Sequence, residues 1–133
     1  MLTIGRLASA CDVNIDTIRY YERKNILQPS GRTDAGYRLY SQDSIARLNF
    51  VRSAQTLGFT LSEIAELLDL QSSNDKDCGD IQSQAAQKVI EIEDKINNLL
   101  QIKKALKSLI NDCPGAGAPL SECSILHYLD EPK

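Results

Sequence analysis

The chain has 133 residues and a formal net charge of −3, a size that fits one or two small units and excludes a large enzyme. No apolar run approaches the ~20 residues needed to cross a bilayer, so we expect no membrane partner. The first residues do not form a basic segment followed by an apolar one, so we expect no secretory signal. Four cysteines then favour a reducing, cytoplasmic setting, where cysteines bind metals or react more often than they form disulfides.

The charge is distributed unevenly along the chain. Residues 1–59 carry eight Lys/Arg and five Asp/Glu, a balance of +3, whereas residues 60–133 carry seven and thirteen, a balance of −6. All seven arginines lie within the first 52 residues. Arginine forms bidentate contacts with phosphates and guanine edges, so the N-terminal part is expected to bind nucleic acid despite the acidic chain average.

The first 24 residues predict two short helices joined by a turn. Thr3 is a good N-cap for a helix that runs to about Ala10, residues 11–14 form the turn, and a second helix spans about Ile15 to Lys24. This arrangement is typical of a helix-turn-helix. The second helix presents side chains that suit a DNA groove and its phosphate walls: Asp16, Thr17, Arg19, Tyr20 and Arg23.

Residues 32–40 predict a small hairpin that turns at Asp34-Ala35-Gly36. Tyr37 and Leu39 alternate with their neighbours as in a strand with two faces. The hairpin is either merely solvated or a DNA-binding wing, in which Arg32 and Arg38 reach phosphates.

The rest of the chain predicts helices. Ser41 is expected to cap a helix over residues 42–56, and Thr60-Leu61-Ser62-Glu63 has the form of a capping box that opens a helix to about Leu70. After Gly79 no Gly or Pro interrupts a long helix over 78–112, and a short helix follows over 124–129. We therefore expect a mainly α fold with three parts: a winged helix-turn-helix domain with connecting helices (1–70), a dimerisation helix (78–112), and a metal-binding loop with a terminal helix (113–133).

The long helix carries a regular seam. Its members alternate in steps of four and three, which is coiled-coil spacing: Ala85, Val89, Ile92, Ile96, Leu99, Lys103, Leu106 and Ile110. A helix of ~30 residues is ~45 Å long and cannot bury such a seam against so small a domain. We expect a homodimer through this helix, parallel or antiparallel, rather than a helix that lies across its own domain; Lys103 would set the register or lie near the end of the contact.

Three cysteines mark the ends of the long helix. Cys113 and Cys123 flank a Pro/Gly loop after it, and Cys78 begins it. Two thiolates alone suit Cu(I) or Hg(II), and Cys78 of the same chain lies ~50 Å away along the helix. Antiparallel pairing would bring Cys78 of one chain to Cys113 and Cys123 of the other. The alternatives are small buried apolar residues or a redox disulfide between Cys113 and Cys123.

Several sequence blocks resemble the MerR family of bacterial transcription regulators, and the match covers nearly the whole chain. They are residues 4–8, 17–22, 32–33, 36–40 and 57–61 with Ile64, and the block 17–22 is highly specific. The three C-terminal cysteines resemble those of the heavy-metal-responsive branch, of the ZntR, CadR and PbrR type.

The resemblance implies a winged helix-turn-helix dimer on a palindromic operator, inside a promoter whose two recognition elements lie too far apart for RNA polymerase. Such regulators bend and untwist the DNA when metal binds, so that the polymerase engages both elements. It further implies DNA contacts, mostly to phosphates, by Thr17, Arg19, Tyr20, Tyr37 and Arg38, with Arg52 touching the backbone.

The resemblance also implies a metal site built across the dimer from Cys78, Cys113 and Cys123. Copper-sensing members carry serine where Cys78 stands, so Cys78 favours a divalent ion. Three thiolates suit Cd(II), Pb(II) and Hg(II); we rank Cd(II) or Pb(II) first, Zn(II) next and Hg(II) third. Zinc would need a fourth ligand from water or from a nearby side chain: Asp77, Asp80, Glu122 or His127. Pro114 and Ala118 replace the second cysteine and the histidine that zinc sensors often carry in this loop.

Two remaining residues are assigned structural roles: Cys11 to the core and His127 to the surface or a helix cap. No arrangement of catalytic residues is visible, so we expect no enzyme. Two other functions stay open. One is a regulator of the same family that responds to an oxidant or an organic ligand, and the other is a metal-buffering protein with a basic N-terminal part.

Overall fold

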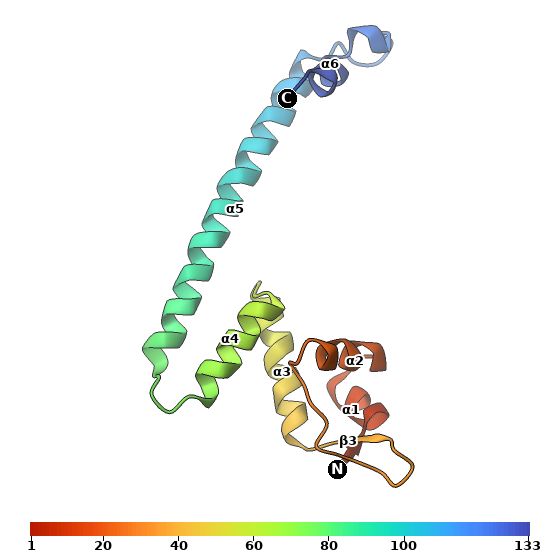
Figure 1. Cartoon of the computed structure of the whole chain (residues 1–133). Coiled ribbons are helices and arrows are strands. Elements are labelled where there is room, and N and C mark those ends of the chain that lie inside the picture. The colour runs from red at the N-terminus through yellow and green to blue at the C-terminus, as the bar shows by residue number, and fades with distance from the viewer. The chain divides into compact units, whose positions relative to one another are not determined.

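The computed structural model describes residues 1–133, and Figure 1 follows its elements along the chain. The chain forms two compact units, residues 1–85 and 86–133. The elements of the first unit are β1 (Leu2–Thr3), α1 (Ile4–Cys11), α2 (Ile15–Arg23), β2 (Gly31–Arg32), β3 (Arg38–Tyr40), α3 (Asp43–Thr56) and α4 (Leu61–Ser72). Helix α5 (Cys78–Asp112) begins in this unit and continues into the second, which also holds a single 3-10 turn (Leu120–Glu122) and α6 (Ser124–Asp130).

The predicted helix-turn-helix is confirmed, and its caps explain where the helices begin. Thr3 has extended backbone and its hydroxyl accepts from the Arg6 amide at 3.3 Å. Asn14 does the same for α2, accepting from the Thr17 amide at 2.8 Å. Asp12 adopts a left-handed conformation (φ 54°), which ends α1 and turns the chain toward α2.

The wing is a three-stranded antiparallel sheet in the order β1-β3-β2. The hairpin of β2 and β3 was predicted, but β1 was not. Leu2 pairs with Tyr40 and Thr3 with Leu39, so β1 exists through pairing with distant residues rather than through its own sequence. Gly36, at φ 89°, supplies the positive φ that the hairpin turn requires.

The core of the first unit gathers side chains from α1 to α4, from β3 and from the segment after α2. Its fully buried members come from every one of these elements: Leu7, Ile18, Leu27, Tyr40, Leu48, Val51 and Ile64. Tyr40 ties the wing to this core, because its ring is 0% exposed. The core thus fixes the helix-turn-helix and the wing on one scaffold.

One predicted cap is wrong and another is confirmed. Helix α3 begins at Asp43 after Gln42, whose backbone is already helical (φ −61°, ψ −27°) and whose side chain makes no capping hydrogen bond. Ser41 contributes only its backbone carbonyl, which accepts from Ser44 at 3.1 Å. The capping box of α4 is complete, because Thr60 accepts from the Glu63 amide at 3.2 Å and Glu63 accepts from the Thr60 amide at 2.8 Å.

Helix α5 runs over 35 residues from Cys78 to Asp112, as predicted. Its seam is open in the single chain: Val89, Ile92, Ile96, Leu99, Leu106 and Ile110 are each 40–64% exposed. No helix, α5 included, has the length and apolar character of a membrane span.

Candidate functional site

Helix α2 presents the first group of predicted DNA-binding residues. Arg19 is exposed, with one guanidinium nitrogen 3.6 Å from the carboxylate of Asp16. The ring of Tyr20 is 41% exposed. Thr17 is held differently, because its hydroxyl donates to the Asn14 side chain at 2.9 Å and so keeps a fixed orientation at the start of the helix.

The wing presents the second group. Tyr37 is 73% exposed at the hairpin turn, and Arg32 donates across the turn to the Gly36 carbonyl at 3.2 Å. Arg38 lies on β3 with its guanidinium 2.5 Å from the carboxylate of Glu22 on α2. The wing and the helix are therefore linked through charged side chains.

Helix α2 and the wing together line a concavity of about 570 Å³. Four arginines line it: Arg19, Arg23, Arg32 and Arg38. The structure thus brings three predicted residues, Arg19, Arg32 and Arg38, to one surface. A concave, arginine-lined surface focuses positive potential on a phosphate backbone.

Glu22 was not predicted as a functional residue. It lies in the last turn of α2, its side chain is 10% exposed, and it accepts from both Arg38 and the hydroxyl of Tyr40. It also lines the arginine-rich concavity. Its partners lie 16 and 18 residues further along the chain, so no local pattern marks it.

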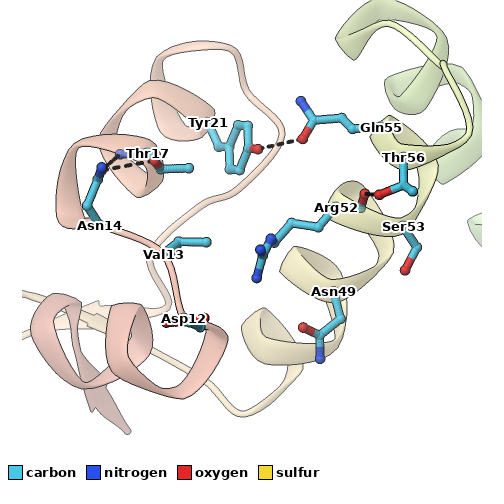
Figure 2. A pocket seen from close by; sticks show the side chains of 10 residues that line it. All are labelled: Asp12, Val13, Asn14, Thr17, Tyr21, Asn49, Arg52, Ser53, Gln55 and Thr56. Atoms are coloured by element: carbon cyan, nitrogen blue, oxygen red, sulfur yellow. Dashed lines mark hydrogen bonds between the residues drawn. The ribbon is translucent and has the colours of Figure 1, made fainter.

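Arg52 lies apart from this surface, on α3. Figure 2 shows its side chain extending from α3 toward the turn between α1 and α2, in a polar cavity of about 890 Å³ that Asn14, Thr17 and Asn49 also line. Its guanidinium donates to the Cys11 carbonyl at 2.5 Å. Arg52 therefore holds the C-terminal end of α1 in place beside the start of α2.

All four cysteines are free thiols, in different environments. Cys78 is exposed at the first residue of α5, while Cys113 and Cys123 are half-buried on either side of the loop that follows the helix. Cys11 is 4% exposed in the core, and burial raises the pKa of its thiol, against a smaller lowering by Arg52. The core role predicted for Cys11 is confirmed.

The loop between Cys113 and Cys123 folds back on α5. The Ser124 hydroxyl, next to Cys123, donates to the Leu109 carbonyl at 2.9 Å in the last turn of the helix. Gly115 and Gly117 have φ of 87° and 90°, which makes the reversal possible at low cost. Both loop cysteines therefore flank a closed segment at one end of α5. Within a single chain, no three His, Cys, Asp or Glu side chains come together as a metal site.

This fold defines a winged helix-turn-helix protein followed by a long exposed helix. The chain belongs to the MerR family: residues 2–71 match the MerR helix-turn-helix regulatory protein family, and residues 45–109 match the family described as MerR, DNA binding.

Relatives match nearly the whole chain. A mercuric resistance operon regulatory protein of Bacillus cereus is 40% identical over 126 residues, 95% of each chain. The transcriptional regulator ZntR of Escherichia coli K12 is 35% identical over 132 residues, 98% of this chain and 94% of its own. The crystal structure of the regulator PbrR691 from Ralstonia metallidurans CH34 with lead(II) matches with a TM-score of 0.87 at 29% identity, covering 97% of this chain and 99% of that one.

Proposed function

We propose that this protein is a metal-responsive transcription regulator. It binds a palindromic promoter operator as a homodimer, and a soft divalent ion converts the complex into an activator by distorting the DNA so that RNA polymerase engages both promoter elements. The protein is not an enzyme in this proposal, and it acts in the cytoplasm. The observation that carries it is the placement of free thiols at both ends of one long helix whose apolar seam is exposed.

The exposed seam of α5 supports a dimer. Ile92, Ile96 and Leu99 are 40–64% exposed in the single chain. Apolar surface left in water costs about 25 cal/mol per Å². A second copy of the same helix has the spacing needed to cover this seam.

Residue spacing supports an antiparallel pair. In an antiparallel pair of identical helices, the numbers of any two residues that face each other add up to the same total. Seam residues then meet seam residues, Ala85 with Leu106 and Ile92 with Leu99, and Ile96 lies beside its own copy near the centre. The same sum opposes Cys78 to Cys113, so one register serves both the seam and the metal site.

The charges along α5 favour the same orientation. Its first half (78–95) carries four acidic and two basic residues, and its second half (96–112) carries three basic and one acidic residue. A parallel pair would place halves of like net charge together, which is unfavourable. An antiparallel pair places halves of opposite net charge together, although it sets Lys88 against Lys103.

The metal site in this proposal uses Cys78 of one chain with Cys113 and Cys123 of the other. The closed loop supports it, since the Ser124–Leu109 hydrogen bond holds the two loop cysteines at the end of α5 that an antiparallel partner's Cys78 would approach. All three are free thiols that water reaches, so an ion from solution can reach and bind them.

The donor set favours ions that accept three thiolates, which are Cd(II), Pb(II) and Hg(II). Of the relatives described above, one is named as the regulatory protein of a mercuric resistance operon and another was crystallised in complex with lead(II). Zinc needs a fourth ligand. Asp77 and Asp80 already accept from backbone amides at the start of α5. His127 follows Cys123 by one turn and its amide bonds to the Cys123 carbonyl at 3.1 Å, which makes it the better zinc candidate.

The DNA contacts in this proposal come from α2 with Thr17, Arg19 and Tyr20 and from the wing with Arg32, Tyr37 and Arg38. Arg52 on α3 is a separate contact to the DNA backbone. The support for the contacts from α2 and the wing is the arginine-lined concavity and the exposure of Tyr20 and Tyr37. Twofold symmetry of the dimer calls for a palindromic operator.

In vitro transcription from the protein's own promoter tests the proposal, with free Pb(II), Cd(II), Zn(II) and Hg(II) held at buffered concentrations. We expect activation by at least one of these ions and none by Cu(I), diamide or peroxide. Activation by copper alone would exclude the three-thiolate divalent site. Activation by the oxidants would favour the redox alternative, and metal binding without operator binding would favour the metal-buffering alternative.

A further inference from the structure

We propose that Glu22 is a positioning residue for operator recognition: its carboxylate fixes the wing relative to α2 and so determines specificity for DNA sequence. This inference rests on the proposed DNA-binding function. Glu22 itself is assigned no contact with DNA.

The geometry of the carboxylate carries the argument. One oxygen of Glu22 pairs with the guanidinium of Arg38 and the other accepts from the hydroxyl of Tyr40. Both partners lie on β3, the central strand of the wing. A single side chain of α2 therefore holds the strand at two points two residues apart, which restrains both its distance and its orientation.

Burial makes the link strong. The Glu22 side chain is only 10% exposed, and Tyr40 is fully buried. Hydrogen bonds to a carboxylate that is largely removed from water are stronger than exposed ones. Arg38 is 45% exposed, so it is held on one side by Glu22 while its other face stays open to a phosphate.

Electrostatics alone would disfavour a carboxylate at this point. Glu22 lines the same concavity as Arg19, Arg23, Arg32 and Arg38, where a negative charge weakens attraction for DNA. Removing the charge should therefore strengthen non-specific binding. A positioning role predicts the opposite for sequence discrimination, because base readout requires α2 and the wing to be correctly placed at once.

The substitution Glu22→Gln separates the two effects. The amide keeps the shape of the side chain but removes its charge. Arg38 loses its ion pair, and the Tyr40 hydroxyl must either accept from the NH₂ group or share the remaining oxygen with Arg38, so both contacts become weaker, neutral hydrogen bonds. Glu66→Gln is the matched control. It makes the same chemical change at an exposed residue of α4, outside the proposed DNA surface.

The test measures the affinity of the metal-free full-length protein for two duplexes. One is enriched by the wild-type protein from a randomised pool, and the other is a scrambled sequence of equal length and composition. The readout is the ratio of the two affinities. We expect Glu22→Gln to lower this ratio about tenfold, while Glu66→Gln leaves it within about twofold.

The variant Tyr40→Phe extends the test without changing any charge. It removes the hydroxyl and keeps the buried ring, so we expect a fall in the same ratio, and no further fall when it is combined with Glu22→Gln. Because one protein sample is measured on both duplexes, partial unfolding cancels from the ratio. A merely structural role would leave the ratio unchanged.

The outcomes are distinct. If the wild-type protein shows no preference for its enriched duplex, the proposed DNA-binding function fails. If the wild-type protein discriminates and Glu22→Gln discriminates equally well, or if the losses from Glu22→Gln and Tyr40→Phe simply add, the positioning role is overturned.

Discussion

Cys78 distinguishes a cross-chain metal site from a clip made by the loop alone. We expect Cys78→Ser to abolish metal-induced transcription and to weaken binding of Pb(II) or Cd(II) by about a hundredfold, because hydroxyl oxygen is a poor ligand for soft ions. Operator binding by the metal-free protein should not change, since Cys78 lies in α5 and outside the DNA surface. In vitro transcription and a competitive chelator titration measure both effects.

Cys11→Ala is the matched control for this experiment. It removes a thiol that is buried in the core, so it should cost about 1 kcal/mol of stability and leave the metal response intact. Metal-induced transcription that survives Cys78→Ser would contradict the three-cysteine site.

The thiols should also differ in reactivity. In the metal-free protein we expect three of them to react quickly with Ellman's reagent and Cys11 to react only on unfolding, because burial raises its pKa and shields its sulfur. Because the pKa of the Cys11 thiol is higher in the folded protein than in the unfolded chain, the folded protein loses stability as the pH rises through these two values, in strongly alkaline solution. A bound ion should protect the three fast thiols. Four equal rates would contradict these assignments.

The proposed dimer depends on α5, and the centre of this helix is where a substitution should weaken the dimer most. In the antiparallel register Ile96 lies beside its own copy, so Ile96→Glu places two carboxylates together in an apolar seam. We expect the dimer to weaken at least about a hundredfold, or about 3 kcal/mol, by sedimentation equilibrium. Ile90→Glu is the control, because Ile90 is as exposed as Ile96 (51% and 50%) but lies off the seam; equal effects of the two would contradict the register.

Local signals explain which elements could be predicted. The capping box at Thr60–Glu63 uses partners three residues apart, and the seam of α5 repeats within one helix, so both were visible in the sequence. Ser41 was misread, because a cap also needs extended backbone at the capping residue, and the chain is already helical at Gln42.

Long-range pairing explains what could not be predicted. Strand β1 is only two residues long and depends on Leu39 and Tyr40. Glu22 acquires its role from Arg38 and Tyr40. The residue types on α2 and the hairpin were enough to predict a DNA-binding surface. The contacts between α2 and the hairpin could be seen only in the folded structure. The proposed third metal ligand, Cys78 of a second chain, raises the same problem between chains, since no single chain gathers three donors.

At the scale of the whole molecule, if metal binding changes the shape of the DNA, then the shape of the DNA must also change the affinity of the protein for the metal. An ion can shift the complex toward distorted DNA only by binding that state more tightly, so distorted DNA must raise the affinity for the ion by the same factor. We expect an operator duplex made flexible by a central nick to bind Pb(II)-loaded protein more tightly than metal-free protein. The intact duplex should show a smaller difference, because it resists bending and untwisting.

The same factor should appear in the metal affinity of the protein when it is measured by chelator competition on the nicked and intact duplexes. Coupling of 1–3 kcal/mol is typical, or roughly 5- to 150-fold. The Cys78→Ser protein supplies the control, because it should bind both duplexes with affinities that do not depend on the ion. A metal affinity identical on free protein, intact operator and nicked operator would mean that the ion does not act through DNA shape, whatever its effect on transcription.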